Sequence, residues 1–229
     1  MKKIVVGIAA VMAFVFTACL DDDGYSLGDM WVGFGVLKGE EPGSYLIFMD
    51  SKDVLVPTAS NQPGWQEEYE SGDRVLVNYT ILEEDATSSI PRYYVKVNRI
   101  ENVLMKGIMD ITTENEDSIG NDPIIVQDYW VADSLLSFKL KYWGYDRIHF
   151  LNLVKQPGDI TEEDQPIQLE LRHNANQDAE SVPYSAFVSF SLNSLRIEGL
   201  DSVRFEFTST DYDGIIHTEE GVFNYSDLE

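Results

Sequence analysis

Alternation of apolar and polar residues is the feature of this sequence that most restricts its fold. Residues 167–173 read Ile-Gln-Leu-Glu-Leu-Arg-His, and the same period of two recurs at residues 186–192 and 203–207. Successive side chains of a strand point to opposite faces, so this period is typical of strands with one buried face. The 12 Tyr and 11 Phe residues also favour strands. The sequence therefore predicts an all-β protein.

The first half of the chain contains a series of short apolar runs separated by turn residues. Gly33 and Gly35 fall inside the first run, where glycine often marks a bulge or a tight barrel bend, and Pro57 ends the third. The runs cover residues 30–37, 45–49, 54–56, 75–82, 93–100 and 103–108. Short strands at this density suit a small Greek-key barrel such as an OB fold, which we expect at residues 29–109.

The second half is expected to form a separate domain. Residues 110–122 are acidic and polar with few apolar positions, so we interpret them as a linker. Beyond them, alternating runs recur with turn signals between them, including the hairpin signal Asp213-Gly214. This pattern predicts a β-sandwich at residues 123–229.

The N-terminus has the layout of a secretory signal peptide. Lys2 and Lys3 form a basic start, and an apolar run follows from Ile4 to Phe16. This run of thirteen residues is too short for a membrane-spanning helix, which needs about 20 residues. We therefore expect residues 1–18 to be removed as a signal peptide.

The end of this leader resembles a bacterial lipobox. Phe16-Thr17-Ala18-Cys19 has the two small residues and the cysteine of that pattern, with Phe16 in a position where an aliphatic residue is usual. The resemblance implies that Cys19 carries diacylglycerol and becomes the new N-terminus. Two or three acyl chains hold a protein firmly, at about 0.8 kcal/mol for each buried CH₂. An ordinary signal peptide cut after Ala18 and an uncleaved anchor are the alternatives.

The acidic residues after the cysteine predict where the protein is located. Asp21, Asp22 and Asp23 resemble the surface-export signal of lipoproteins in one phylum of Gram-negative anaerobes, and the alternative is a solvated spacer. Residues 19–28 are accordingly expected to be a lipidated, acidic tether. The expected location is the outer membrane, at the cell surface, or otherwise facing the periplasm.

Charge limits the partners. The chain carries 40 Asp and Glu against 16 Lys and Arg, a formal charge of −24. Nucleic-acid binding needs a basic surface, so it is excluded. The excess mainly keeps the protein soluble, and it would also favour a cationic protein or peptide partner.

No catalytic, cofactor or metal motif is found in the sequence. The three histidines have no zinc-ligand spacing, and neither a P-loop nor a nucleophile elbow occurs. His149 is interpreted as a strand histidine with an ordinary hydrogen bond. Asn176, Asp178 and Glu180 are either a solvated loop or a weak calcium site. We expect a protein without enzyme activity, cofactor or metal.

Two kinds of surface site are predicted. Trp65 follows Gln62-Pro63-Gly64, so it is the best candidate for an exposed aromatic ligand contact. Ser118, Ser134 and Ser202 each follow Asp and precede an apolar residue, which resembles the O-glycosylation signal of exported proteins in the same anaerobes. Turn chemistry is the alternative for all three serines.

The whole arrangement resembles the NigD-like lipoproteins. The resemblance rests on the Cys19 leader, on residues 72–79 (Gly-Asp-Arg-Val-Leu-Val-Asn-Tyr) and on residues 171–174 (Leu-Arg-His-Asn). It implies an N-terminal OB domain, a C-terminal β-sandwich and no established enzyme activity. The family's name comes from a bacteriocin locus, which implies a protective, immunity-like role.

Two functions follow as expectations. The first is a membrane-anchored, non-enzymatic binding or protective module that engages a protein or peptide. The second is a glycan-binding or glycan-processing component of a cell-surface system, which would need an aromatic platform and a cleft with paired carboxylates.

Overall fold

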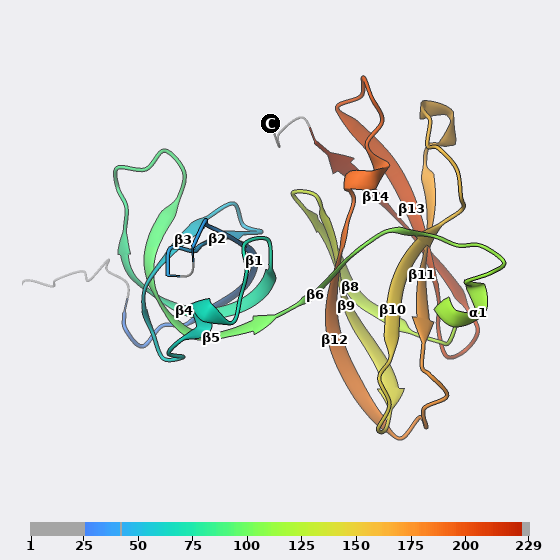
Figure 1. The fold of residues 1–229 in the computed structure, drawn as a ribbon, viewed down its shortest axis with the longest axis horizontal. Coiled ribbons are helices and arrows are strands. Elements are labelled where there is room, and N and C mark those ends of the chain that lie inside the picture. The colour runs from blue at the N-terminus through green and yellow to red at the C-terminus, as the bar shows by residue number, and fades with distance from the viewer. Residues whose placement is uncertain (1–25, 42, 226–229) are drawn as a thin grey trace, which may run out of the picture.

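Residues 26–41 and 43–225 are described by the computed structural model, and almost all of their regular structure is β-strand (Figure 1). The predicted signal peptide and lipidated Cys19 lie outside the described residues. Within these residues, no helix is both long enough and apolar enough to cross a membrane. The two halves of the chain form a barrel and a sandwich, as the alternating pattern predicts.

Five strands close the N-terminal barrel in the order β1-β2-β3-β5-β4. Strand β1 pairs with both β2 and β4, and β3 runs parallel to β5, so no free edge is left. Inward side chains from these strands, together with Trp65 and Tyr69, make the barrel core. The elements are β1 (Trp31–Lys38), β2 (Leu46–Met49), β3 (Val54–Ser60), η1 (Trp65–Glu67), β4 (Arg74–Glu84) and β5 (Arg92–Asn102).

The C-terminal half is a sandwich of two sheets, with orders β14-β13-β11-β10-β7 and β6-β12-β9-β8. Its strands are β6 (Leu104–Gly107), β7 (Met109–Asp110), β8 (Ile125–Ala132), β9 (Leu135–Gly144), β10 (Phe150–Lys155), β11 (Ile167–Asn174), β12 (Val182–Ser191), β13 (Ser202–Thr210) and β14 (Ile216–Asn224). Three short helices connect them: α1 (Glu116–Ile119), η2 (Glu162–Asp164) and η3 (Asn193–Leu195).

The alternation of apolar and polar residues along a strand determines which of its side chains lie in the sandwich core. In β13, Val203, Phe205 and Phe207 are buried between the sheets, whereas Arg204 on the opposite face is exposed. Each such Phe side chain contributes roughly 2–3 kcal/mol by leaving water. The period of two in the sequence therefore directly specifies which face of this sheet is covered.

The domain boundary lies earlier than the sequence predicts. The barrel ends at Asn102, and residues 104–107 join the sandwich by pairing with β12 as strand β6. The expected linker at 110–122 is likewise part of the sandwich, since Ile111 and Ile119 are buried against Val154. Polar composition suggested a linker, but these two apolar residues are enough to fix the segment against β10.

A buried polar network joins the two domains. Arg74 is fully buried and binds both carboxylate oxygens of Asp50, with Nη–Oδ distances of 2.5 and 2.6 Å. It also donates to the hydroxyls of Ser137 and Ser189 on the sandwich, and Trp130 Nε1 donates to Asp50 over 2.7 Å. Trp130, Ser137 and Ser189 are register neighbours on β8, β9 and β12. The guanidinium group thus lies over one row of the sandwich sheet.

Candidate functional site

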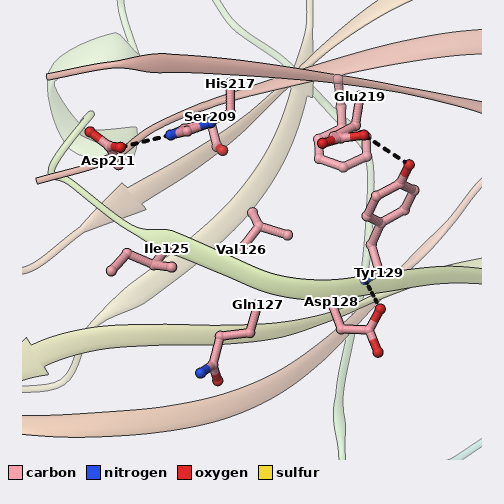
Figure 2. Close-up of a pocket in the computed structure, with 10 residues that line it drawn as sticks. Ile125, Val126, Gln127, Asp128, Tyr129, Ser209, Asp211, His217 and Glu219 are labelled. Carbon is pink, nitrogen blue, oxygen red and sulfur yellow. Dashed lines mark hydrogen bonds and ion pairs between the residues drawn. The ribbon is translucent and has the colours of Figure 1, made fainter. Parts of the chain in front are cut away.

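A groove opens between β8 and β14, the edge strands of the two sandwich sheets. Its volume is about 380 Å³. Figure 2 shows its side chains, which come from β8 on one side and from β13, β14 and the turn between them on the other. They are Ile125, Val126, Gln127, Asp128, Tyr129, Phe207, Ser209, Asp211, His217 and Glu219.

The groove exists because β8 does not fully cover the inner face of β14. His217 and Glu219 lie on the same face of their strand as buried Phe223, yet both are exposed. Strand β8 also carries a bulge between Val126 and Asp128, which shifts its pairing with β9. An extra residue bends a strand locally, and here this bend lies beside the opening.

The floor of the groove is apolar and closed. Phe207 is 1% exposed, and the Tyr129 ring packs edge-on against it at 4.9 Å between centroids. Ser209 beside it is also buried. A segment that enters the groove would therefore meet apolar surface at the bottom.

The rim is acidic. Asp211 and Glu219 flank His217, the one lining residue that can carry positive charge, whereas the Asp128 carboxylate lies on the other side of β8 and accepts the Tyr129 backbone N–H over 2.9 Å (Figure 2). His217 Nε2 bonds Asp211 Oδ2 at 2.7 Å, and this hydrogen bond is the largest of several that lower the pKa of the Asp211 carboxyl. Glu219 forms no ion pair with a cation among the described residues. The site thus offers negative charge to a ligand.

Tyr129 connects the floor of the groove with its rim, because its ring packs on Phe207 and its hydroxyl bonds to Glu219. Its hydroxyl donates to Glu219 Oε2 over 3.2 Å and also reaches the Glu220 carbonyl at 3.4 Å. Burial, and after it the bond to Glu219, raises the pKa of the Tyr129 phenol above its ordinary value of about 10. The phenol is therefore neutral at pH 7 and acts as a donor.

A second polar cluster lies at another place in the sandwich, where the His149 and Asp178 side chains are 4% and 2% exposed. His149 Nδ1 and His173 Nε2 are 2.8 Å apart, His149 Nε2 is 3.1 Å from Asp178, and His173 Nδ1 donates to the Pro123 carbonyl over 2.8 Å. Tyr142 packs against both rings. Burial is the main cause that lowers the pKa of His173. His149 thus has two polar partners rather than the single ordinary bond expected.

Asp178 fixes loops in this cluster. Burial alone would raise the pKa of its carboxyl, but hydrogen bonds hold that pKa far below the ordinary range; the donors are Tyr145, Asp146 and Ala179 backbone N–H groups and His149. Its oxygens are therefore engaged in the loop that contains the calcium candidates Asn176 and Glu180. Across residues 26–41 and 43–225, no group of three or more His, Cys, Asp or Glu side chains is arranged to hold a metal ion.

The residues predicted as sites lie apart from the groove or beyond the described chain. Cys19, Asp21, Asp22 and Asp23 fall outside the described residues. Ser118 is exposed in α1, where its hydroxyl donates to the Asn115 carbonyl over 2.8 Å. Ser134 and Ser202 are partly exposed at the beginnings of β9 and β13. All three serines stay candidates for O-glycosylation.

The prediction that Trp65 is an exposed ligand contact is wrong. Its side chain is 3% exposed and belongs to the barrel core, in edge contact with Tyr69 at 6.0 Å. Gly64 adopts a left-handed conformation with φ of 75°, and the following helical turn directs the indole inward. The turn at Pro63 and Gly64 was predicted correctly, but the direction of the next side chain was not. The expected platform for a glycan thus loses its best member.

Sequence reasoning missed the groove itself. The sequence predicts alternating strands beyond residue 122 and a hairpin at Asp213-Gly214, so the elements themselves are expected. Their proximity depends on which strand lies at the edge of each sheet, and alternation alone does not encode strand order. The only local signal was that Asp128 and Glu219 fall within otherwise apolar or alternating runs.

Comparisons with known proteins agree with this architecture. Residues 34–103 match the model of the NigD-like N-terminal OB domain, and residues 107–219 match that of the NigD-like C-terminal beta sandwich domain. These limits also agree with a boundary close to residue 103. No curated protein sequence matches the chain.

Solved structures share the fold. A protein named as toxin-related from Parabacteroides distasonis is 28% identical, with a TM-score of 0.75, over 87% of this chain and 96% of that one. A NigD-like immunity protein from Bacteroides caccae is 18% identical, with a TM-score of 0.64, over 85% and 94%. A protein of unknown function from Bacteroides vulgatus is 22% identical, with a TM-score of 0.69, over 86% and 91%.

Proposed function

The chain belongs to the NigD-like family, and from this premise we propose that it is a non-enzymatic binding module, held outside the cytoplasm by lipid on Cys19, that captures a basic polypeptide segment. The groove between β8 and β14 is the proposed binding site. The protective, immunity-like role is supported by the names of two similar proteins, one toxin-related and one an immunity protein.

The anchor is supported by the sequence alone. A basic start, a short apolar run and Thr17-Ala18-Cys19 are the parts that lipid attachment needs. Labelled palmitate should enter the wild-type protein and not the Cys19→Ser variant, which should also leave the membrane fraction. Protease treatment of intact cells should degrade the protein if the residues Asp21, Asp22 and Asp23 direct it to the outer surface.

The observation that carries the binding role is an apolar floor beneath an acidic rim. The Tyr129 ring, packed on buried Phe207, supplies surface for the aliphatic stems of Lys or Arg, while Asp211 and Glu219 supply charge for their ends. Complementary charge raises the rate of encounter and selects against acidic partners. The formal charge of −24 over the whole chain favours the same class of partner.

Binding of a fluorescent lysine-rich peptide tests this function. The full mature protein in non-ionic detergent should bind the peptide at low salt. It should lose most binding at 300 mM salt, where the Debye length is shorter than the roughly 8 Å of 0.15 M salt. The variant Glu219→Gln should bind about tenfold more weakly. The matched control is Glu163→Gln, which removes one exposed acid outside the groove.

The result is decisive in either direction. Binding that is retained by the control but reduced in the groove variant supports the site. Equal binding by both variants would show that Glu219 in the rim of the groove is not involved.

A further inference from the structure

The four free edges of the sandwich differ in how well they could accept another strand. The edges are β7 and β14 in one sheet and β6 and β8 in the other. Strand β7 has two residues, β6 has four, and β8 is interrupted by its bulge. Short or bulged strands are common ways to protect an edge. Strand β14 has nine residues, contains no proline and pairs with β13 without a register shift.

The backbone groups that β14 leaves unpaired can be assigned from the ends of its ladder. Tyr225 N donates to the Asp201 carbonyl over 2.9 Å, and Asp211 N donates to the Ile215 carbonyl over 3.0 Å. Hydrogen-bonded pairs alternate along an antiparallel ladder, so the odd-numbered residues of β14 bond to β13. The even-numbered residues then direct their N–H and C=O groups away from the sheet: Ile216, Thr218, Glu220, Val222 and Asn224.

A contact of Tyr129 agrees with this assignment. Its hydroxyl reaches the Glu220 carbonyl at 3.4 Å, which requires that carbonyl to point away from β13 and toward β8. The distance is long for a hydrogen bond to a hydroxyl. The outward groups of Ile216 and Thr218 lie on the open side of this contact, next to the groove residue His217.

We propose that the basic segment binds by adding a strand to the free edge of β14, at residues 216–220. This inference rests on the proposed function and defines its binding mode. Backbone hydrogen bonds supply part of the affinity, and alternate side chains supply the specificity. The added strand extends the sheet over the opening that β8 leaves uncovered.

The environment on the two faces of the edge specifies the partner sequence. One face of the added strand lies over the groove, beside Glu219 and Asp211, so the alternate residues on that face are basic. Its other face continues the outer face of the sheet beside Ile216 and Thr218, and Ile216 is 67% exposed. The residues on this second face are apolar or β-branched. The partner is therefore a segment that alternates Lys or Arg with Val, Ile or Thr.

A second copy of this protein fits the edge poorly. Pairing of two β14 edges would bring Glu219 and Glu220 of each copy close to those of the other. Like charges directly opposite one another destabilise a strand pair. The acidic edge thus disfavours self-pairing and favours a basic partner.

Peptides with a blocked backbone test the proposal without changing the protein. The probe is a seven-residue peptide that alternates Lys and Val. One control has the same composition with its Lys and Val residues grouped into two separate runs. Two further peptides are N-methylated at either the odd or the even positions. A strand that adds to one edge directs only one of these two sets of N–H groups toward β14. We expect at least tenfold weaker binding for one methylated peptide and binding close to that of the unmethylated peptide for the other. The peptide with grouped Lys and Val residues should also bind more weakly.

A variant of the edge tests the same mode from the other side. Thr218→Pro removes an outward N–H that the β13 ladder does not use, and edge strands tolerate proline. This variant should bind the alternating peptide at least tenfold more weakly, and Thr218→Val, which keeps the outward N–H, should lose clearly less binding than Thr218→Pro. The peptide series stands even if Thr218→Pro fails to fold.

The outcomes separate the two claims. Parental binding by both methylated peptides, or equal losses in both, overturns strand addition and leaves the acidic groove as the site. Failure of every basic peptide to bind overturns the proposed function itself.

Discussion

Neighbouring residues of β8 lie in two opposite kinds of surface. Trp130 faces the barrel, in the junction with Arg74 and Asp50, whereas Tyr129 faces the groove beside Glu219. The junction places a fully buried guanidinium against a carboxylate and two hydroxyls, so its polar groups satisfy one another. The groove leaves acidic side chains facing solvent above a closed apolar floor.

The difference separates a structural contact from a binding surface. A buried, mutually bonded network fixes geometry, and loss of one member leaves another unpaired. An open acidic rim gains little from its own contacts and is available for a ligand. Changes in the junction should therefore alter stability, and changes in the groove should alter binding.

The largest expected effect is that of Arg74→Ala. Removal of the guanidinium leaves Asp50, whose side chain is 20% exposed, without its ion-pair partner. We expect the free energy of unfolding to fall by about 3 kcal/mol, measured by urea denaturation followed by circular dichroism. The control is Arg99→Ala, which removes a cation that is 75% exposed and paired with Glu101. A similar small loss in both variants would show that the junction network is not a structural lock.

A smaller effect compares the two neighbours on β8. Trp130→Phe removes the indole N–H that donates to the Asp50 carboxylate and should cost about 2 kcal/mol. Tyr129→Phe removes a hydroxyl bonded to Glu219 at the open rim and should cost under about 1 kcal/mol. The same urea measurement gives both values. A reversed order would contradict the distinction between junction and groove.

The smallest effect concerns the ionisation of Tyr129. Because burial and Glu219 raise the pKa of its phenol, Glu219→Gln should bring this pKa down toward the ordinary value. Absorbance titration of the phenolate, with Tyr129→Phe to identify the signal, measures the change. The folded-state pKa lies above the unfolded one, so the contribution of Tyr129 to stability is present below pH 10 and is lost as pH rises further. An unchanged titration in Glu219→Gln would mean that the two groups are not coupled.

Local patterns predicted more than long-range contacts did. The alternation in residues 203–207 identified buried Val203, Phe205 and Phe207, and the fold class, OB barrel and sandwich are confirmed. The direction of Trp65 was wrong because it depends on a single glycine conformation. The linker was wrong because two buried isoleucines outweigh the polarity of their neighbours. The groove could not be predicted, since it depends on the order of strands in two sheets.

Hydrogen–deuterium exchange with and without the Lys-Val alternating peptide tests the central claim most directly. In the free protein, the outward amides of Ile216, Thr218 and Glu220 should exchange fast. The peptide should slow exchange at these amides and leave the barrel strands unchanged. Protection of the barrel strands, with residues 216–220 exchanging as fast as before, would contradict the assignment of the sandwich edge as the binding surface.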